Sequence, residues 1–179
     1  MEKETAPEQA GFRRGPGTHN HLTTLQIITE KARKRRQPLF MVFGDYRQAF
    51  DSVCHAKLWK GLRELEFSPQ LISLIRNLYE NSSAGVRISG KRSNNFKPER
   101  GTRQGCPLSP YLFNLISELL MRLALEGFDG GTRIGGVRIT NLRYADDIVL
   151  IAESLEELQR LLDRVEAASA EMGLVINVD

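Results

Sequence analysis

The stretch LRYADDIVLIAES, residues 142–154, decides the fold of this 179-residue chain. The flanks NLRY and IVLIA are strand-like, and Tyr144-Ala145-Asp146-Asp147 lies between them. The pattern predicts a hairpin with two adjacent aspartates in its tight turn. Aspartate is favoured in turns for local reasons alone, so the pair by itself leaves a purely structural explanation open.

A second aspartate follows an independent strand. The run LFMVF at 39–43 is short and unbroken, which predicts a strand buried on both faces, and it ends at Gly44-Asp45. If this strand and 148–152 are neighbours, Asp45 meets the Asp146-Asp147 pair at one rim of a sheet. Asp51 lies at an expected helix start, where we assign it a capping role.

Three packed carboxylates repel each other unless a cation compensates them. Mg²⁺ prefers such oxygen ligands, and two ions about 3.5–4 Å apart can stabilise both the attacking and the leaving oxygen of an in-line displacement at phosphorus. The pattern therefore predicts a shared metal site made of Asp45, Asp146 and Asp147.

Apolar periodicity predicts the remaining elements. Helices are expected at 22–32, 57–65, 69–79 and 110–125, and another begins at the capping box of Ser154 and Glu157 and ends at Gly173. The helix at 69–79 should bury Leu71, Leu74, Ile75 and Leu78, and the last helix should bury Leu155, Leu158, Leu161, Leu162 and Val165. Further strands are expected at 135–142, 148–152 and 174–178.

The composition is that of a globular protein, with 41% hydrophobic and 26% charged residues. No apolar run approaches the length of a membrane span and no secretory signal is visible, so we expect an intracellular protein, nuclear or cytoplasmic, without a membrane partner. Cys54 and Cys106 lack the spacing of a zinc site, which predicts two reduced thiols.

The formal net charge of +3 says little, but basic residues gather at 31–36 and again at 87–103. The second group lies in a predicted hairpin, 84–100, and such clusters suit contact with phosphates. Solvated helix ends and linkers have the same composition, so this alternative stays open for the run KARKRRQ.

Three blocks together resemble the palm of reverse transcriptases, most of all the non-LTR retrotransposon (long interspersed element) type: FGDYRQAFDSV at 43–53, GTRQGCPLSPYLFNL at 101–115 and LRYADDIVLIAES at 142–154. EQAGFRRGPGT at 8–18 and MGLVIN at 172–177 fit the same order. The resemblance implies an α+β polymerase palm, an antiparallel sheet backed by helices, with a partial fingers subdomain. It also implies an RNA-directed DNA polymerase that adds dNTPs to a primer 3′-hydroxyl with two Mg²⁺ ions, for which Mn²⁺ can substitute.

The resemblance assigns a role to each matching residue. Asp45 becomes the metal ligand of the first block, and Asp146 and Asp147 become the pair of the YADD motif. Nucleotide contacts fall to Phe50, as an aromatic gate against the 2′-hydroxyl, and to Gln104 and Gly105. Tyr144 would lie beside the primer end, while Arg103 and Arg13 contact either phosphate or surface carboxylates.

As domains, we expect a partial reverse transcriptase domain over 1–179, with a fingers remnant at 8–40 and the palm at 41–179; a thumb and an endonuclease are expected to be absent. The partners would be an RNA template and a primer or RNA–DNA duplex, and the oligomeric state is left open. Two alternatives remain: a catalytically silent remnant that only binds nucleic acid, and a metal-binding or structural domain with no nucleic-acid partner.

Overall fold

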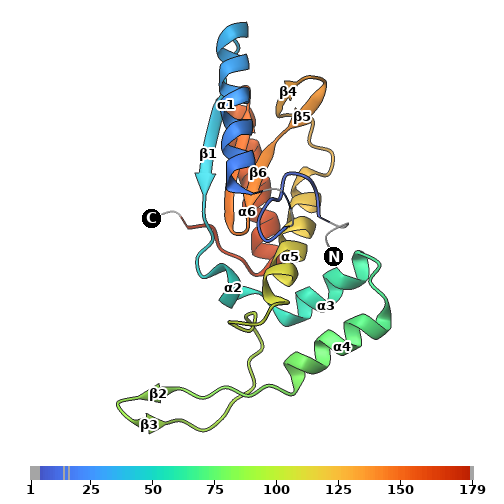
Figure 1. The fold of residues 1–179 in the computed structure, drawn as a ribbon, viewed down its shortest axis with the longest axis vertical. Helices are drawn as coiled ribbons and strands as arrows, with labels where there is room; N and C mark the ends of the chain where they lie inside the picture. The colour runs from blue at the N-terminus through green and yellow to red at the C-terminus, as the bar shows by residue number, and fades with distance from the viewer. Residues whose placement is uncertain (1–4, 14, 16, 178–179) are drawn as a thin grey trace.

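A computed structural model describes residues 5–13, 15 and 17–177 (Figure 1). Its elements are, in chain order, α1 (Thr18–Arg35), β1 (Phe40–Gly44), α2 (Ala49–Ser52), α3 (His55–Glu64), α4 (Pro69–Glu80), β2 (Arg87–Ile88), β3 (Lys91–Arg92), α5 (Ser109–Leu125), β4 (Thr132–Ile134), β5 (Val137–Ile139), β6 (Asn141–Tyr144), β7 (Asp147–Ala152) and α6 (Leu155–Met172). The predicted helices are confirmed, with ends that differ by a few residues. Among the described residues, no helix combines the length and apolar character that crossing a bilayer requires.

The central sheet has three antiparallel strands in the order β1-β7-β6. Strand β7 is the middle one because its run IVLIA is apolar at every position and can be covered on both faces. It pairs with β1 from Phe40↔Ala152 to Gly44↔Ile148, and with β6 up to Tyr144↔Asp147. The predicted neighbourhood of the two strands is thus confirmed.

Helices cover both faces of this sheet. Ile148, Leu150 and Ala152 join the main core with α5 and α6, and α5 is buried nearly all round between Leu112 and Met121. On the other face, Leu142 and Ile151 pack against Ile28 of α1. The result is an antiparallel sheet backed by helices, which confirms the predicted α+β class.

Strand β1 is less buried than predicted. The run at 39–43 was expected to be covered on both faces, yet the side chain of Phe43 is 70% exposed. Because β1 is an edge strand and Phe43 lies past the apolar contacts of α1, nothing among the described residues covers that position fully.

The face that helix α4 turns to the core matches the prediction only in part: Ile75 is buried and Leu71 is partly buried against the core, as predicted. It buries Ile72, Ile75 and Tyr79, whereas Leu74 and Leu78 are exposed. The Tyr79 ring packs against Trp59 of α3 at 5.7 Å between centroids, so the position of α3 decides which stripe of α4 is buried. The stripe of α6 is confirmed except at its first member, because Leu155 is exposed.

Three further expectations are corrected. The strand expected at 135–142 is divided: Gly135 and Gly136, both with positive φ, make the turn of a β4–β5 hairpin, and β6 begins afresh at Asn141. The strand expected at 174–178 is reduced to a single bridge, Tyr46↔Ile176, with its last residue outside the described part. Asp51 does not cap a helix, because Gln48 is the N-cap of α2 and Asp51 lies within its first turn.

The predicted basic hairpin is present as β2–β3. Figure 1 shows it projecting away from the rest of the molecule, and residues 85–97 are all exposed. Both cysteines are free, as predicted. The cationic side chains of the hairpin are therefore exposed to solvent.

Candidate active site

The strand register gathers the three predicted aspartates at one end of the sheet. The β1–β7 ladder ends at the pair Gly44↔Ile148, and Asp45 and Asp147 are the next residues of the two strands at that end. Asp146 lies in the turn between β6 and β7. The backbone of Asp45 is fixed by the amide of Asn177, which donates to its carbonyl at 2.8 Å, and its carboxylate accepts from the amide of Tyr46 at 2.8 Å.

The pKa of Asp146 is consistent with three carboxylates at one end of the sheet. Burial raises the pKa of the Asp146 carboxyl above its ordinary value, and the negative charges of Asp147 and Asp45 raise it further. Asp146 therefore lies where the charges of both other carboxylates reach it. Within residues 5–13, 15 and 17–177, however, no three His, Cys, Asp or Glu side chains are gathered closely enough to hold a metal ion. The metal assignment consequently stays a prediction.

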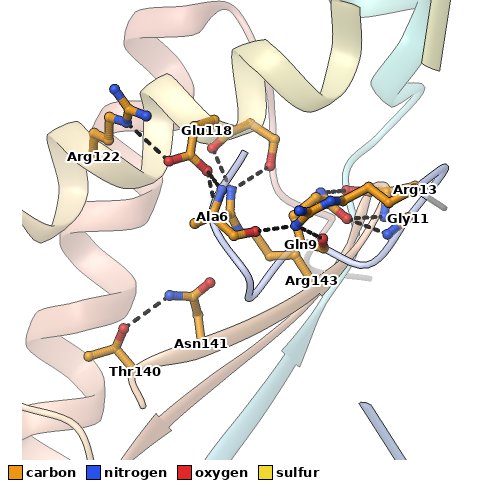
Figure 2. Close-up of polar contacts among 11 residues, drawn as sticks. Ala6, Gln9, Gly11, Arg13, Glu118, Arg122, Thr140, Asn141 and Arg143 are labelled. Carbon is orange, nitrogen blue, oxygen red and sulfur yellow. Dashed lines mark hydrogen bonds and ion pairs between the residues drawn. The ribbon is translucent and has the colours of Figure 1, made fainter. Parts of the chain in front are cut away.

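The turn that carries Asp146 is held by a residue that sequence reasoning did not single out. The side-chain amide of Gln9, which is fully buried, hydrogen-bonds both the N–H and the C=O of Ala145. Gln9 belongs to the block EQAGFRRGPGT, but nothing local in that block indicates a partner 136 positions away. Figure 2 shows Gln9 within the polar contacts of the N-terminal segment.

A buried ion pair adjoins the same turn. Arg143, just before Tyr144, donates to Glu118 of α5 at 3.0 Å, and the two side chains are only 3% and 5% exposed (Figure 2). Burial alone would raise the pKa of Glu118, but the charge of Arg143 and hydrogen bonds from Ala6 and Arg122 outweigh it, so the pKa is lowered. A carboxylate inside the apolar run LFNLISELLM is a sequence signal for such a pair, because a buried charge needs a partner.

The predicted nucleotide-binding residues come together. Phe50, Gln104 and Gly105 line one pocket of about 480 Å³, together with Arg103. The loop 101–105 is anchored to α2, since the amide of Thr102 donates to the Phe50 carbonyl at 2.7 Å. Glycine is favoured at 105 because the backbone there has a positive φ of 78°.

The Phe50 ring is fixed on two sides. It stacks on Phe113 of α5 at 4.7 Å between centroids, and the edge of Phe12 meets it at 6.2 Å. Phe12 directly follows Gly11, where an added Cβ would come within 2.2 Å of the Ala145 nitrogen. This chain of contacts brings the pocket at Phe50 close to the aspartate turn, although they belong to segments far apart in the sequence.

The three predicted primer and template residues, Tyr144, Arg103 and Arg13, differ in their exposure and contacts. Tyr144 is 36% exposed and lines a mostly apolar hollow with Asp147 and Phe43. Arg103 is exposed and donates to the carbonyl of Leu78 at 3.3 Å. Arg13 donates to the carbonyls of its own loop, at Ala6 and Gln9, and the contacts of both arginines with phosphate stay predictions.

Comparison with known proteins identifies the family of this chain. The family described as reverse transcriptase (RNA-dependent DNA polymerase) matches residues 1–179. The Pol polyprotein of the R2DM element of Drosophila melanogaster is 32% identical over 97% of this chain, and that of an R2 element of Nasonia vitripennis is 34% identical over 93%. The polymerase of the mobile element jockey of Drosophila funebris is 30% identical over 94%. The chain spans only 16–18% of the length of these relatives.

Solved structures share the fold. Apo telomerase of Candida tropicalis, truncated from its C-terminal domain, superposes with a TM-score of 0.71 over 95% of this chain and 34% of its own, at 15% identity. The RNA-dependent RNA polymerase of bacteriophage phi12 gives a TM-score of 0.57 at 13% identity, over 83% of this chain and 26% of its own. The chain belongs to the reverse transcriptase family, and its relatives are Pol proteins of R2 and jockey non-LTR retrotransposons.

Proposed function

We propose that this chain is the core of an RNA-directed DNA polymerase, a nucleotidyltransferase that adds deoxynucleotides to a primer 3′-hydroxyl. The observation that carries the proposal is the strand register, which brings the end of β1, just before Asp45, and the Asp146-Asp147 turn to the same end of the sheet. Phosphoryl transfer depends mainly on positioning and on compensation of charge, and three carboxylates at one end of a sheet would suit both needs.

Asp45, Asp146 and Asp147 would hold Mg²⁺, for which Mn²⁺ can substitute. Their donors are all carboxylate oxygens, the ligands that these hard cations prefer. The raised pKa of Asp146 supports the fit, because a cation would relieve the repulsion from Asp147 and Asp45. When bound, two such ions supply charge stabilisation for the attacking and leaving oxygens.

The pocket beside the turn would receive the incoming nucleotide. Phe50 is held in place by its ring contacts, so its edge would exclude a 2′-hydroxyl from the sugar. The Gln104 amide can hydrogen-bond a base, and Gly105 permits close approach of the backbone. Tyr144, in the hollow beside Asp147, would contact the primer end.

Template binding would draw on the basic surfaces. The exposed Arg87, Lys91 and Arg92 of the hairpin would contact phosphates, and Arg103 is an exposed residue of the nucleotide pocket. A structural neighbour, telomerase of Candida albicans, was solved in complex with a fragment of telomeric RNA and superposes with a TM-score of 0.69. An RNA template paired with a growing DNA strand would fit these sites, in the nucleus or cytoplasm.

The test is incorporation of a single nucleotide on an RNA template with a DNA primer and Mg²⁺, because one addition makes smaller demands on duplex grip than processive synthesis. We expect incorporation by this chain, and stronger incorporation when it is followed by a thumb in a longer polypeptide. Asp146→Asn should abolish incorporation in both while leaving RNA binding intact. Equal loss of binding and incorporation would contradict the assignment.

A second candidate is a catalytically silent remnant that only binds nucleic acid. It is favoured by one observation, namely that the described carboxylates are not drawn together into a metal-holding group. Salt-dependent RNA binding without incorporation, even in the longer polypeptide, would establish this candidate in place of the first.

A further inference from the structure

The Gln9 side chain makes two hydrogen bonds to the aspartate turn and one to its own segment. Its Oε1 accepts from the amides of Ala145 at 2.9 Å and Gly11 at 2.8 Å, and its Nε2 donates to the carbonyl of Ala145 at 3.2 Å. The side chain is fully buried, so water cannot replace these bonds.

The bonded residue is the one on which the turn depends. Ala145 has a φ of 57°, a left-handed conformation that residues with a Cβ adopt only when surrounding contacts impose it. Its N–H belongs to the peptide shared with Tyr144, and its C=O belongs to the peptide shared with Asp146. By holding both, one carboxamide fixes the two peptide planes that aim the Asp146 side chain.

Gln9 is itself rigidly placed. The segment 8–10 runs along β6 as a short parallel bridge, in which the Ala10 amide donates to the Arg143 carbonyl at 2.9 Å and the Arg143 amide donates to the Glu8 carbonyl at 2.7 Å. The buried Asn114 of α5 donates to the Gly11 carbonyl at 2.7 Å. The segment that holds the turn is therefore itself held by α5, a helix that is buried over most of its length.

Gly11 shows how closely the segment approaches the turn. A Cβ at this position would come within 2.2 Å of the Ala145 nitrogen and 2.9 Å of its Cα. Since these are backbone atoms, any side chain at 11 would displace either the segment or the turn. The backbones of Gly11 and Ala145 are therefore in close contact, which limits movement of Gln9 relative to Ala145.

We propose that Gln9 is a positioning residue that locks the Ala145 turn so that the Asp146 carboxylate is aimed at the metal site. It does not touch substrate or metal, and its effect on metal binding rests on the proposed function. Residues that orient metal ligands typically change metal affinity by about 10- to 100-fold when they are replaced.

The test compares variants of the 179-residue chain. Gln9→Met keeps the length and volume of the side chain and removes all three hydrogen bonds. The matched control is Thr132→Val, which removes a partly buried hydrogen bond from Thr132 to Glu153, the residue that follows the far end of β7. Two quantities are measured: hydrogen exchange of the Ala145 amide by NMR, and binding of Mn²⁺ alone by electron paramagnetic resonance.

In Gln9→Met we expect the Ala145 amide to exchange at least about ten times faster while the Leu150 amide of β7 stays protected, and Mn²⁺ to bind about 10- to 100-fold more weakly. Thr132→Val should change neither quantity. Unchanged protection at Ala145 would overturn the inference, and so would an equal loss of protection at Ala145 and Leu150, because that pattern reports general destabilisation.

Two further variants keep the result decisive. If Gln9→Met does not fold, Gly11→Ala forces the segment and the turn apart and so disturbs the Gln9–Ala145 hydrogen bonds without removing the Gln9 amide; wild-type exchange at Ala145 in that variant would overturn the inference. Asp146→Asn separates the two proposals. If wild type binds Mn²⁺ no better than Asp146→Asn, the proposed metal function fails, and amide exchange alone still decides whether Gln9 holds the turn.

Discussion

Replacing Glu118 by Leu should cost about 3–5 kcal/mol of folding free energy, although Glu118 lies outside the proposed catalytic chemistry. Its carboxylate accepts from Arg143 at 3.0 Å, from Arg122 at 3.0 Å and from the amide of Ala6 at 3.1 Å. The substitution leaves the buried Arg143 guanidinium without a counter-charge, with only its hydrogen bonds to Ser117, while its own Nε already lacks a partner. For a chain of this size, the cost corresponds to a fall in Tm of roughly 6–20 °C.

A double-mutant cycle isolates the contribution of the pair. Arg143→Met alone should also destabilise strongly, because it leaves Glu118 as an unpaired buried carboxylate. The double variant should lie within about 2 kcal/mol of wild type, because apolar side chains of similar volume replace a desolvated ion pair at little net cost. Urea unfolding followed by circular dichroism gives each free energy. The control is Glu64→Leu, which breaks the exposed pair with Lys60 and should cost no more than about 0.5 kcal/mol.

The pH dependence provides an independent check. Because the pKa of Glu118 is lowered on folding, its stabilising contribution is present above the ordinary pKa of glutamate and is lost as the pH falls through the folded value. Wild type should therefore lose more stability on acidification than the double variant does. The reasoning is refuted if Glu118→Leu costs less than about 1 kcal/mol, or if the double variant is as destabilised as the sum of the two singles.

Three other predictions concern the site. Asp146→Asn should raise the Tm of the metal-free chain at pH 7. The pKa of the Asp146 carboxyl is raised on folding, so its ionisation makes the folded state less stable as the pH rises past the ordinary pKa of aspartate. An unchanged Tm in scanning fluorimetry with EDTA would contradict this. Phe50→Val should admit ribonucleotides in the incorporation assay, and unchanged sugar selectivity would remove the gate assignment. Replacing Arg87, Lys91 and Arg92 by Gln should lower the salt slope of RNA binding by about 2 to 3 without changing Tm, and an unchanged slope would exclude the hairpin from phosphate contact.

Much of the fold was predictable because it is coded locally. Helix α6 begins where the Ser154 hydroxyl accepts from the Glu157 amide at 3.1 Å and ends at Gly173 with a φ of 83°, as its capping residues predict. The face that α4 buries was not predictable, because its sequence carries two apolar stripes. Contact between Tyr79 and Trp59 selects one of them, and the sequence of α4 alone contains no information on where α3 lies.

Some residues of the candidate site were likewise predictable from the sequence and others were not. Aspartates at strand ends and the Gln104-Gly105 loop are visible as motifs, because their chemistry depends on residue type and spacing. Gln9 is not visible in this way, because a buried glutamine owes its role to a partner that only the folded chain brings near. Glu118 was predictable only in part. Its charge within an apolar helix predicts a partner but does not reveal that the partner is Arg143.

Helix α5 relates the nucleotide pocket to the aspartate turn. Ser109, at its first turn, lines the pocket beside Phe50, and Glu118 holds the strand that leads into Asp146. With a rise of 1.5 Å per residue, these two positions lie roughly 13 Å apart along the helix axis. Asn114, between them, fixes Gly11 and through it the segment that carries Gln9 and Phe12. Because both halves of the site are attached to one buried helix, a change in the packing of α5 would alter the distance between nucleotide and carboxylates. In-line transfer tolerates such changes poorly, so core substitutions in α5 should reduce incorporation more than they reduce nucleic-acid binding.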